Sequence, residues 1–288
     1  MTGIEKVGVA GFGTMGAGIT EVLVRAGVLV VAYAPDAAAA ASGRARLEYS
    51  TARAVERGKM TGGERESVLE QIVVTTDLAD LADCDLVVEA APERLSVKKT
   101  LFAELDALVK PEAIFASNTS SLRITELAVA TSRPGRVVGT HFFNPAPVIS
   151  LVELVTTVAT EADVIAGVQA FLGRIGRTVV EVRDRPGFIA NGLLFGYLSH
   201  AVSILEERYA SREDIDAALR FGCGYTMGTL ALLDLIGLDT AYDILDSMYH
   251  DTRDVLHAPA PLIKQLVMAG RLGRQSGQGF YTYEMPGS

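Results

Sequence analysis

The fold of this chain is decided by the stretch Val7-Gly8-Val9-Ala10-Gly11-Phe12-Gly13-Thr14-Met15-Gly16. Its first four residues are small or β-branched and apolar, as in a buried parallel strand. Three glycines follow, and apolar residues then recur at the helical spacing of Ile19, Val22 and Leu23. The stretch therefore predicts a strand, a tight turn and a helix, which together form the opening unit of a doubly wound α/β fold.

The glycine turn carries the first functional prediction. Between a strand and a helix it directs the free amides of the helix N-terminus at a bound group, which favours a phosphate. Gly11 permits the tight turn, Gly13 lets the backbone approach the phosphate, and Gly16 lets the helix pack close to the strand. We therefore expect the turn, including Thr14 and Met15, to bind the pyrophosphate of a dinucleotide.

The acidic residue that usually accompanies such a turn is missing. About 20 positions on, at the end of the second strand, a carboxylate normally accepts the ribose hydroxyls, but here that position is Ala34. Asp36 lies two residues further and is either a ribose ligand or the N-cap of the next helix. Ala34 would not repel the 2'-phosphate of NADP, yet no arginine or lysine between Tyr33 and Ser42 would attract one. We predict NAD as the cofactor and leave NADP open.

Short β-branched runs alternate with helical patterns through the first two thirds of the chain, which predicts a Rossmann-like, mostly parallel sheet covered by helices. The segment from Pro35 to Leu69 interrupts this rhythm, and Gly58, Gly62 and Gly63 mark a turn within it. We expect a helical hairpin that projects from the sheet. The predicted strands are Val7–Ala10, Val28–Tyr33, Ile72–Thr75, Leu86–Glu89, Ile114–Ser117, Val137–His141, Leu151–Val155 and Val179–Val182.

A charged turn, Asp184-Arg185-Pro186-Gly187, follows the last predicted strand, and the pattern then becomes helical. We place the domain boundary here, with a dinucleotide-binding domain over residues 1–184 and an all-α domain over 185–288. In the second domain apolar residues recur at steps of three and four, namely Leu193, Leu194, Tyr197, Leu198, Ala201, Val202 and Leu205.

Composition argues against several classes of protein. The chain has 26 basic and 35 acidic residues, a formal charge of -9, and no basic run, so we expect no nucleic-acid partner. No stretch approaches the roughly 20 apolar residues of a bilayer span, and no leader pattern is seen, so we expect no membrane segment and a cytoplasmic location. Cys84 and Cys223 lack the spacing of a metal site or disulfide framework, and we expect them to be reduced core residues, with no metal bound.

Four stretches of the sequence are distinctive. They are GFGTMG at 11, IFASNTSSL at 114, HFFNP at 141, and a series from PGFIAN at 186 through LLDLIGLD at 232 to GQGFYTY at 277. With these stretches the chain resembles the short-chain L-3-hydroxyacyl-CoA dehydrogenases, and the resemblance extends from Ile4 to Tyr283. The resemblance implies hydride transfer between a nicotinamide cofactor and a short-chain 3-hydroxyacyl-CoA. It also implies a homodimer or higher homo-oligomer, joined through the helical substrate and dimerisation domain.

Two residues on consecutive predicted strands are candidates for proton transfer. His141 lies at the C-terminal end of its strand, where open α/β sheets place their sites, and imidazole exchanges protons near neutral pH. Glu153 is a lone acid within an apolar run, where an unpaired carboxylate would be costly. The resemblance implies that Glu153 pairs with His141 and orients it. An acid on a solvent-facing edge is the alternative for Glu153.

The resemblance assigns further side chains to the substrate oxygens, the cofactor and the coenzyme A moiety. The side chains for the substrate oxygens are Ser120, Asn144 and Asn191. Those for the cofactor are Glu93, Lys98 and Asn118. Those for coenzyme A are Ser50, Arg57 and the neighbouring Lys59. Positive charge suits the phosphates of coenzyme A. Without the resemblance, Ser120 would be an ordinary loop or cap residue, and Glu93 and Lys98 would be solvated helix residues.

Two other functions stay open from sequence. The same chemistry could act on an acyl-carrier-protein thioester, whose phosphopantetheine could use the same basic surface. Alternatively the chain could bind a dinucleotide without catalysis, although Ser120, His141, Glu153 and Asn191 are all present together, which argues against this.

Overall fold

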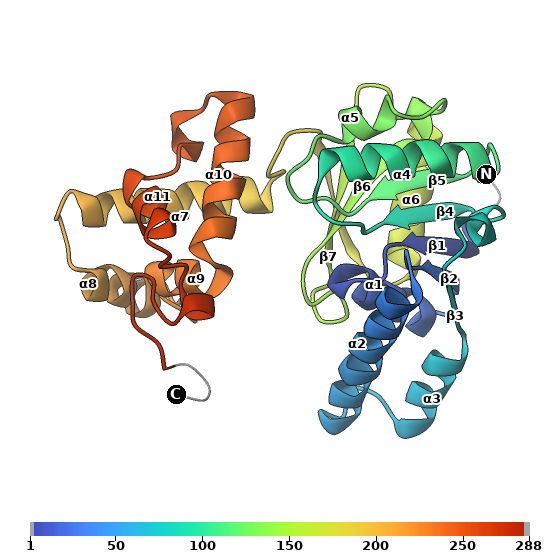
Figure 1. The fold of residues 1–288 in the computed structure, drawn as a ribbon, viewed down its shortest axis with the longest axis horizontal. Helices are drawn as coiled ribbons and strands as arrows, with labels where there is room; N and C mark the ends of the chain where they lie inside the picture. The colour runs from blue at the N-terminus through green and yellow to red at the C-terminus, as the bar shows by residue number, and fades with distance from the viewer. Residues whose placement is uncertain (1–2, 285–288) are drawn as a thin grey trace. The chain divides into compact units, whose positions relative to one another are not determined.

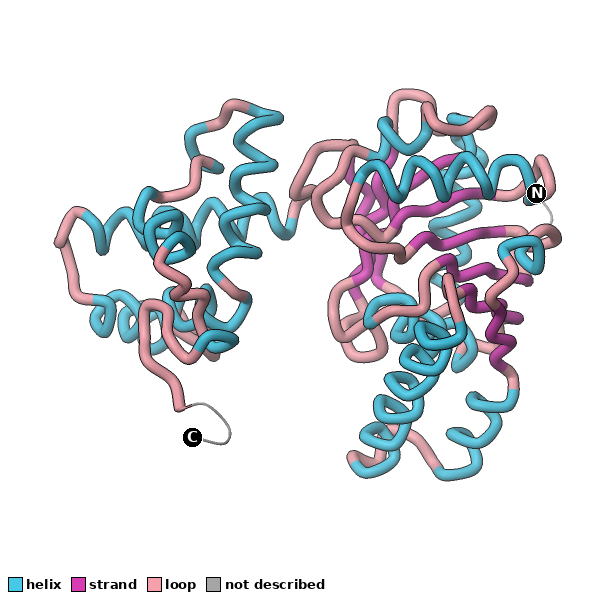
Figure 2. Tube along the Cα trace, in the orientation of Figure 1, coloured by secondary structure: helices cyan, strands magenta, loops and turns pink. Residues whose placement is uncertain are grey.

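The computed structural model describes residues 3–284. The chain divides into two compact units, Met1–Arg185 and Pro186–Ser288. The first unit is a sheet with helices around it, and the second is helical (Figures 1 and 2). The predicted α/β fold with a helical C-terminal part is thus confirmed.

All eight predicted strands are present, and each begins and ends within one residue of the prediction. They form one sheet with the order β3-β2-β1-β4-β5-β6-β7-β8. Their bounds are β1 (Lys6–Ala10), β2 (Leu29–Tyr33), β3 (Ile72–Thr75), β4 (Leu86–Glu89), β5 (Ile114–Ser117), β6 (Val137–Phe142), β7 (Leu151–Thr156) and β8 (Thr178–Arg183).

The sheet is parallel except at one boundary. Neighbouring strands from β3 to β6 are parallel, β7 runs antiparallel to β6, and β8 is parallel to β7. The chain moves outward from β1 through β2 and β3 and then returns to β4 on the other side of β1. This reversal is the switch point at which open α/β sheets bind ligands, beyond the carboxyl ends of the strands. The glycine turn directly follows β1 and lies at this point.

Both faces of the sheet are covered because its central strands are apolar on both sides. On β5, Ile114 and Ala116 join the core that contains α1 (Thr14–Arg25) and α6 (Ala162–Arg174). Phe115 points to the opposite face and makes an edge contact with Phe102 of α4 (Leu95–Leu108), with ring centroids 5.9 Å apart. A short helix, α5 (Ile124–Ala128), follows β5.

The predicted helical hairpin is formed by α2 (Ala37–Glu56) and α3 (Gly62–Glu70), which extend away from the sheet (Figure 1). Thr61 and Glu64 form a capping box at the start of α3. Near its beginning α2 passes directly against the glycine turn, since a Cβ atom on Gly43 would lie 2.2 Å from the carbonyl oxygen of Phe12. The hairpin is therefore held at the turn by a contact that only glycine allows at position 43.

The second unit surrounds its own core, which includes Leu198, Leu233 and Leu245. Buried Asp234 holds the C-terminal segment to this core by accepting hydrogen bonds from the backbone nitrogens of Phe280 and Tyr281, both at 2.9 Å. The helices are α7 (Ala190–Glu206), α8 (Arg212–Ala217), α9 (Thr229–Ile236), α10 (Leu238–Thr252) and α11 (Pro261–Met268).

One expectation about an individual residue is wrong. Cys223 is exposed, whereas Cys84 is buried as expected. Leu193 lies on α7 as its spacing predicted and is 72% exposed. Within residues 3–284, no helix combines the length and the apolar character that crossing a membrane requires.

Candidate active site

The glycine turn has the geometry that close backbone approach requires. Gly11 has a φ of +116°, and a Cβ atom there would lie 2.6 Å from the backbone of Ala90. A Cβ atom on Gly16 would lie 1.7 Å from the carbonyl oxygen of Gly11, so α1 can begin against β1 only with glycine at this position. At Gly13 no atom lies within 4 Å of the Cβ position, and the N-terminus of α1 is open there to a bound group.

A cavity of about 960 Å³ adjoins the turn. Its walls come from the glycine turn, the end of β2, the first half of α2, the loop after β4 and one face of α4. This volume and position suit an extended dinucleotide. The residues that line it are Gly11, Phe12, Gly13, Thr14, Met15, Tyr33, Pro35, Ala39, Ser42, Arg46, Ala90, Ala91, Pro92, Ser96, Val97, Thr100, Leu101 and Glu104.

Asp36 serves as a helix cap in this structure. Its Oδ1 atom accepts a hydrogen bond of 2.7 Å from the backbone nitrogen of Ala39, and it is not among the residues that line the cavity. Of the two interpretations weighed for this residue, the geometry supports the N-cap. A contact between Asp36 and a ribose stays a prediction.

A buried ion pair lies beneath the loops that follow β4 and β5. The ammonium of Lys98 is 2.6 Å from Oε1 of Glu89, 3.1 Å from the carbonyl oxygen of Ala91 and 3.2 Å from Oε2 of Glu93. The other oxygen of Glu89 accepts a hydrogen bond of 2.5 Å from Ser117 at the end of β5. Lys98 and Glu89 are both fully buried, so the interpretation of Lys98 as a solvated helix residue is wrong. Its three N–H donors meet three protein acceptors and tie α4 to the loop after β4.

Glu93 organises the polar loop after β5. Its Oε1 atom accepts hydrogen bonds from the Thr119 hydroxyl, from the backbone nitrogens of Ser120 and Ser121, and from the Ser121 hydroxyl. Burial opposes ionisation of Glu93, but the charge of Lys98 and these hydrogen bonds outweigh it and hold the pKa of the carboxyl below its usual value. Glu93 is therefore ionised at neutral pH and fixes the backbone that carries Ser120.

His141 and Glu153 lie directly opposite each other across the antiparallel pair β6 and β7. Nδ1 of His141 is 2.7 Å from Oε2 of Glu153, and the two residues are only 5% and 1% exposed. Glu153 lies on an interior strand between β6 and β8, so its placement on a solvent-facing edge is excluded. With the Nδ1 proton donated to the carboxylate, the lone pair of a neutral imidazole is on Nε2.

Asn118 links this pair to the loop after β5. Its side-chain oxygen accepts a hydrogen bond of 2.9 Å from the backbone nitrogen of Phe142, the residue after His141. Its position at the carboxyl end of β5 is fixed by the hydrogen bond from its own backbone nitrogen to the carbonyl oxygen of Glu89. The ends of β4, β5 and β6 are therefore coupled by polar contacts on one edge of the sheet.

A second cavity, of about 800 Å³, lies between α1, α2 and the loop after β6. It brings together Ser50, Arg57 and Lys59 of the hairpin with Asn144, which were predicted from separate parts of the sequence. Three further basic residues line it and were not singled out from sequence, namely Arg25, Arg46 and Arg53. Among the described residues that line it, Glu21 is the one acid, and it is paired with Arg25. The cavity is strongly positive, and phosphate groups suit such a lining.

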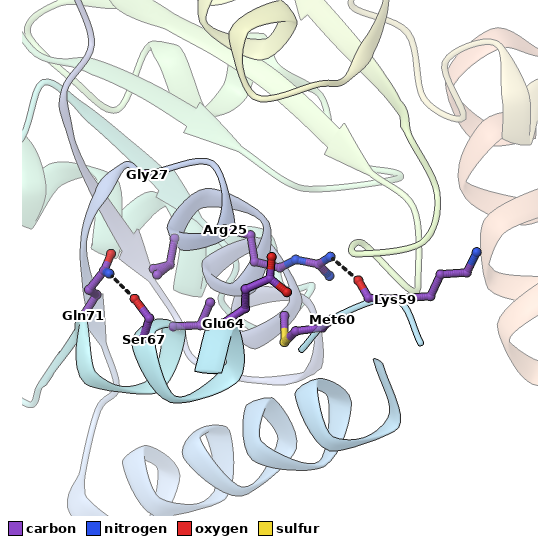
Figure 3. A pocket seen from close by; sticks show the side chains of 9 residues that line it. Arg25, Gly27, Lys59, Met60, Glu64, Ser67 and Gln71 are labelled. Atoms are coloured by element: carbon purple, nitrogen blue, oxygen red, sulfur yellow. Dashed lines mark hydrogen bonds between the residues drawn. The ribbon is translucent and has the colours of Figure 1, made fainter. Parts of the chain in front are cut away.

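The base of the hairpin encloses a smaller cavity of about 390 Å³, shown in Figure 3. Arg25, at the end of α1, donates a hydrogen bond of 3.4 Å to the carbonyl oxygen of Lys59, and Ser67 pairs with Gln71 on the opposite wall. The Lys59 side chain extends away from this cavity (Figure 3). Arg25 thus fixes the backbone of the hairpin loop while the ammonium of Lys59 stays available.

Asn191, the remaining predicted substrate contact, lies in the second unit, where it is the second residue of α7 and half-buried. Two of the other histidines are exposed, and the third, His257, is buried with Nε2 3.2 Å from the carbonyl oxygen of Gly192. Among the four histidines of the chain, only His141 lies at the carboxyl edge of the sheet.

A dinucleotide cavity at the switch point and a buried imidazole and carboxylate pair on the same sheet define a nicotinamide-dependent dehydrogenase. Comparison with known proteins agrees. Residues 6–185 match the model of the 3-hydroxyacyl-CoA dehydrogenase NAD binding domain, and residues 187–283 match that of the 3-hydroxyacyl-CoA dehydrogenase C-terminal domain.

Individual relatives span nearly the whole chain. A 3-hydroxybutyryl-CoA dehydrogenase of Mycobacterium tuberculosis is 47% identical over 97% of this chain and 99% of its own length. The human mitochondrial hydroxyacyl-coenzyme A dehydrogenase is 40% identical over 98% and 92%. The crystal structure of (S)-3-hydroxybutyryl-CoA dehydrogenase from Ralstonia eutropha superposes with a TM-score of 0.95 at 39% identity, over 98% of this chain and 100% of that one.

The chain belongs to the 3-hydroxyacyl-CoA dehydrogenase family. It is an oxidoreductase with an NAD-binding domain, as the sequence predicted.

The buried pair of Glu89 and Lys98 can be tested by removing one charge. Glu89→Gln keeps the shape but leaves the Lys98 ammonium without its closest counter-ion, which costs about 3 kcal/mol at a buried site. We expect the midpoint of thermal unfolding to fall by roughly 5 °C or more.

The matched control is Glu126→Gln, which breaks the exposed pair, 2.9 Å apart, between Glu126 on α5 and Lys99 on α4. That change should cost at most about 1 kcal/mol. Equal melting temperatures for the two variants would contradict the structural role given to Glu89.

Proposed function

We propose that this chain interconverts a short-chain 3-hydroxyacyl-CoA, such as 3-hydroxybutyryl-CoA, and its 3-oxoacyl-CoA, with His141 as the proton-transfer group. The observation that carries the proposal is the buried pair of His141 and Glu153, whose side chains are 2.7 Å apart at the carboxyl edge of the sheet. Relatives of nearly equal length named for 3-hydroxybutyryl-CoA support the short-chain substrate.

Oxidation of a 3-hydroxyl removes a proton from oxygen and a hydride from carbon, and leaves a ketone. The nicotinamide ring, when bound, accepts the hydride in oxidation and returns it in reduction. Nε2 of His141 takes the hydroxyl proton, because Nδ1 is committed to Glu153. As the imidazole becomes positive, the Glu153 carboxylate beside it compensates the charge in a buried site where solvent cannot.

The residues of the first unit fit the cofactor. Gly13 leaves open space at the N-terminus of α1 for a pyrophosphate, and the lining of the adjoining cavity includes Thr14 and Met15. Asn118, held by Phe142, keeps its amide N–H groups for a bound group near His141. We propose that Glu93 and Lys98 act mainly by shaping the loops that face the nicotinamide, since their polar atoms are bound to protein partners.

The basic cavity is proposed to hold the nucleotide part of coenzyme A. Ser50, Arg57 and Lys59 supply a hydroxyl and two positive charges on the hairpin, and Asn144, three residues after His141, lines the same cavity. Ser120, Asn144 and Asn191 are proposed to donate hydrogen bonds to the thioester or 3-hydroxyl oxygens. Residues 1–184 then serve as the dinucleotide-binding domain, and 185–288 as the substrate and dimerisation domain.

The proton-transfer role is tested with acetoacetyl-CoA and NADH, by following loss of NADH absorbance. His141→Gln removes the proton donor and acceptor and should lower kcat by about 10²- to 10⁴-fold. Affinity for NADH, measured by calorimetry, should change less than about threefold, which shows that the variant is folded.

Three outcomes would contradict parts of this proposal. A His141→Gln enzyme that keeps more than a tenth of the wild-type kcat would remove His141 from the chemistry. Turnover of an acetoacetyl carrier-protein thioester, without turnover of acetoacetyl-CoA, would show that the substrate is a carrier-protein thioester and not an acyl-CoA. Binding of NADH without turnover of either thioester would favour a non-catalytic protein.

We also propose a homodimer joined through the helical domain. Among residues 3–284, nine large apolar side chains are exposed in the second unit, against seven in the larger first unit, and burial against another copy would remove them from water. They include Leu193, Phe221, Tyr225 and Met268. Sedimentation equilibrium should give a mass of about twice 30.6 kDa, and a monomer at micromolar concentration would refute the dimer.

A further inference from the structure

One end of the cofactor cavity departs from the pattern of an NAD-selective site. In dinucleotide-binding folds the ribose 2'-hydroxyl lies beside the residue after β2, which is normally acidic. Here that residue is Ala34, which is fully buried and donates its backbone N–H to the carbonyl oxygen of Thr75 at 2.9 Å. Ala34 offers neither an acceptor for the ribose hydroxyls nor a negative charge that would repel a phosphate.

The nearest carboxylate does not replace the missing one. Asp36 is occupied as the N-cap of α2, and its side chain is not part of the cavity wall. Among the described residues that line the cavity, Glu104 is the one acidic residue, and it lies on α4. The wall formed by the end of β2 and the start of α2 therefore carries no negative charge within the described lining.

That same wall carries a positive charge without a counter-ion. Ala39, Ser42 and Arg46 line the cavity and are spaced three and four residues apart, so they share one face of α2. The guanidinium of Arg46 is 2.5 Å from the Ser42 hydroxyl. Within residues 3–284, no carboxylate lies within ion-pairing distance of Arg46, whereas Arg44 and Arg53 on the same helix pair with Glu48 and Glu56.

We propose that Ser42 and Arg46 form a subsite for the 2'-phosphate of NADP(H), so that the enzyme accepts NADPH in addition to NADH. A guanidinium and a hydroxyl together supply the charge-assisted hydrogen bonds that a phosphate monoester takes. Sequence spacing alone does not point to Arg46, because it lies beyond the segment from Tyr33 to Ser42 that follows β2. Helix α2 packs against the glycine turn at Gly43, and this packing places Arg46, one turn further along the helix, beside the cofactor cavity.

The test measures the binding of nucleotide fragments, so its result does not depend on catalysis. It depends on the proposed dinucleotide site but not on the identity of the acyl substrate. Adenosine 2',5'-bisphosphate and adenosine 5'-monophosphate differ only in the 2'-phosphate. We expect the wild-type protein to bind the bisphosphate at least as tightly as the monophosphate by calorimetry. Arg46→Gln should weaken the affinity for the bisphosphate by about tenfold or more and leave the affinity for the monophosphate unchanged.

Arg53→Gln is the matched control for nucleotide binding, since Arg53 lies two turns along the same helix and lines the basic cavity but not the cofactor cavity. It should leave the affinity for both nucleotides unchanged. A reciprocal change, Ala34→Glu, places a carboxylate at the ribose and should reduce kcat/KM for NADPH by at least about tenfold relative to that for NADH. Ala34 is buried, so this variant could fail to fold. Arg46 is exposed, and the Arg46→Gln variant is therefore the decisive test.

Four results would overturn the subsite. The wild-type protein could bind the bisphosphate tenfold more weakly than the monophosphate, or Arg46→Gln could leave the bisphosphate affinity unchanged. Arg46→Gln could raise KM for acetoacetyl-CoA without affecting the bisphosphate, which would assign Arg46 to the basic cavity that it also lines. If neither nucleotide binds, the proposed dinucleotide site is wrong, and the 2'-phosphate subsite within it is wrong as well.

Discussion

The register between β6 and β7 places His141 opposite Glu153, and the chemistry of this molecule depends on that single pairing. It arises at the one antiparallel boundary of an otherwise parallel sheet. In an antiparallel pair, directly opposed residues have their side chains on the same face and within reach of each other. A shift of one residue in either strand would move the imidazole and the carboxylate to opposite faces. Val152 and Leu154, which flank Glu153, and Phe142, which follows His141, fix the register because they must stay in the core.

Around this pair the sheet edge is built from buried polar contacts that cost energy unless all are satisfied. Glu89, Lys98 and Ser117 form such a set beneath the loops after β4 and β5, and each has its partner. A completed network holds loop backbone in place before any ligand binds. Glu93 extends the same network to Ser120, and Asn118 extends it to β6. The residues expected to face the reacting groups thus stand on rigid support.

Much of the fold followed from local pattern, because a β-branched run bounded by turn residues and charge has few alternatives to a buried strand. The glycine turn was equally clear, since only glycine permits the approaches at positions 11 and 16. The pairing of His141 with Glu153 came from resemblance, because strand order and direction are set by contacts distant in sequence. The burial of Lys98 and the role of Glu89 were missed for the same reason. Cys223 was expected in the core but is exposed, because a helical pattern shows which residues share a face and not whether that face is covered. Arg46 was overlooked because only the course of α2 brings it to the cofactor cavity.

We infer that Glu153 holds His141 with a proton on Nδ1, so that Nε2 is the nitrogen that exchanges a proton with substrate. Nitrogen-15 NMR of protein labelled at histidine tests this directly, because the chain has only four histidines and a His141→Gln sample assigns the resonances of interest. We expect neutral His141 to be the Nδ1–H tautomer, with a protonated-type shift at Nδ1 and an unprotonated-type shift at Nε2. In a Glu153→Gln sample this tautomer should no longer dominate. A neutral His141 protonated on Nε2, or a mixture of tautomers like that of free histidine in the wild-type protein, would contradict the account.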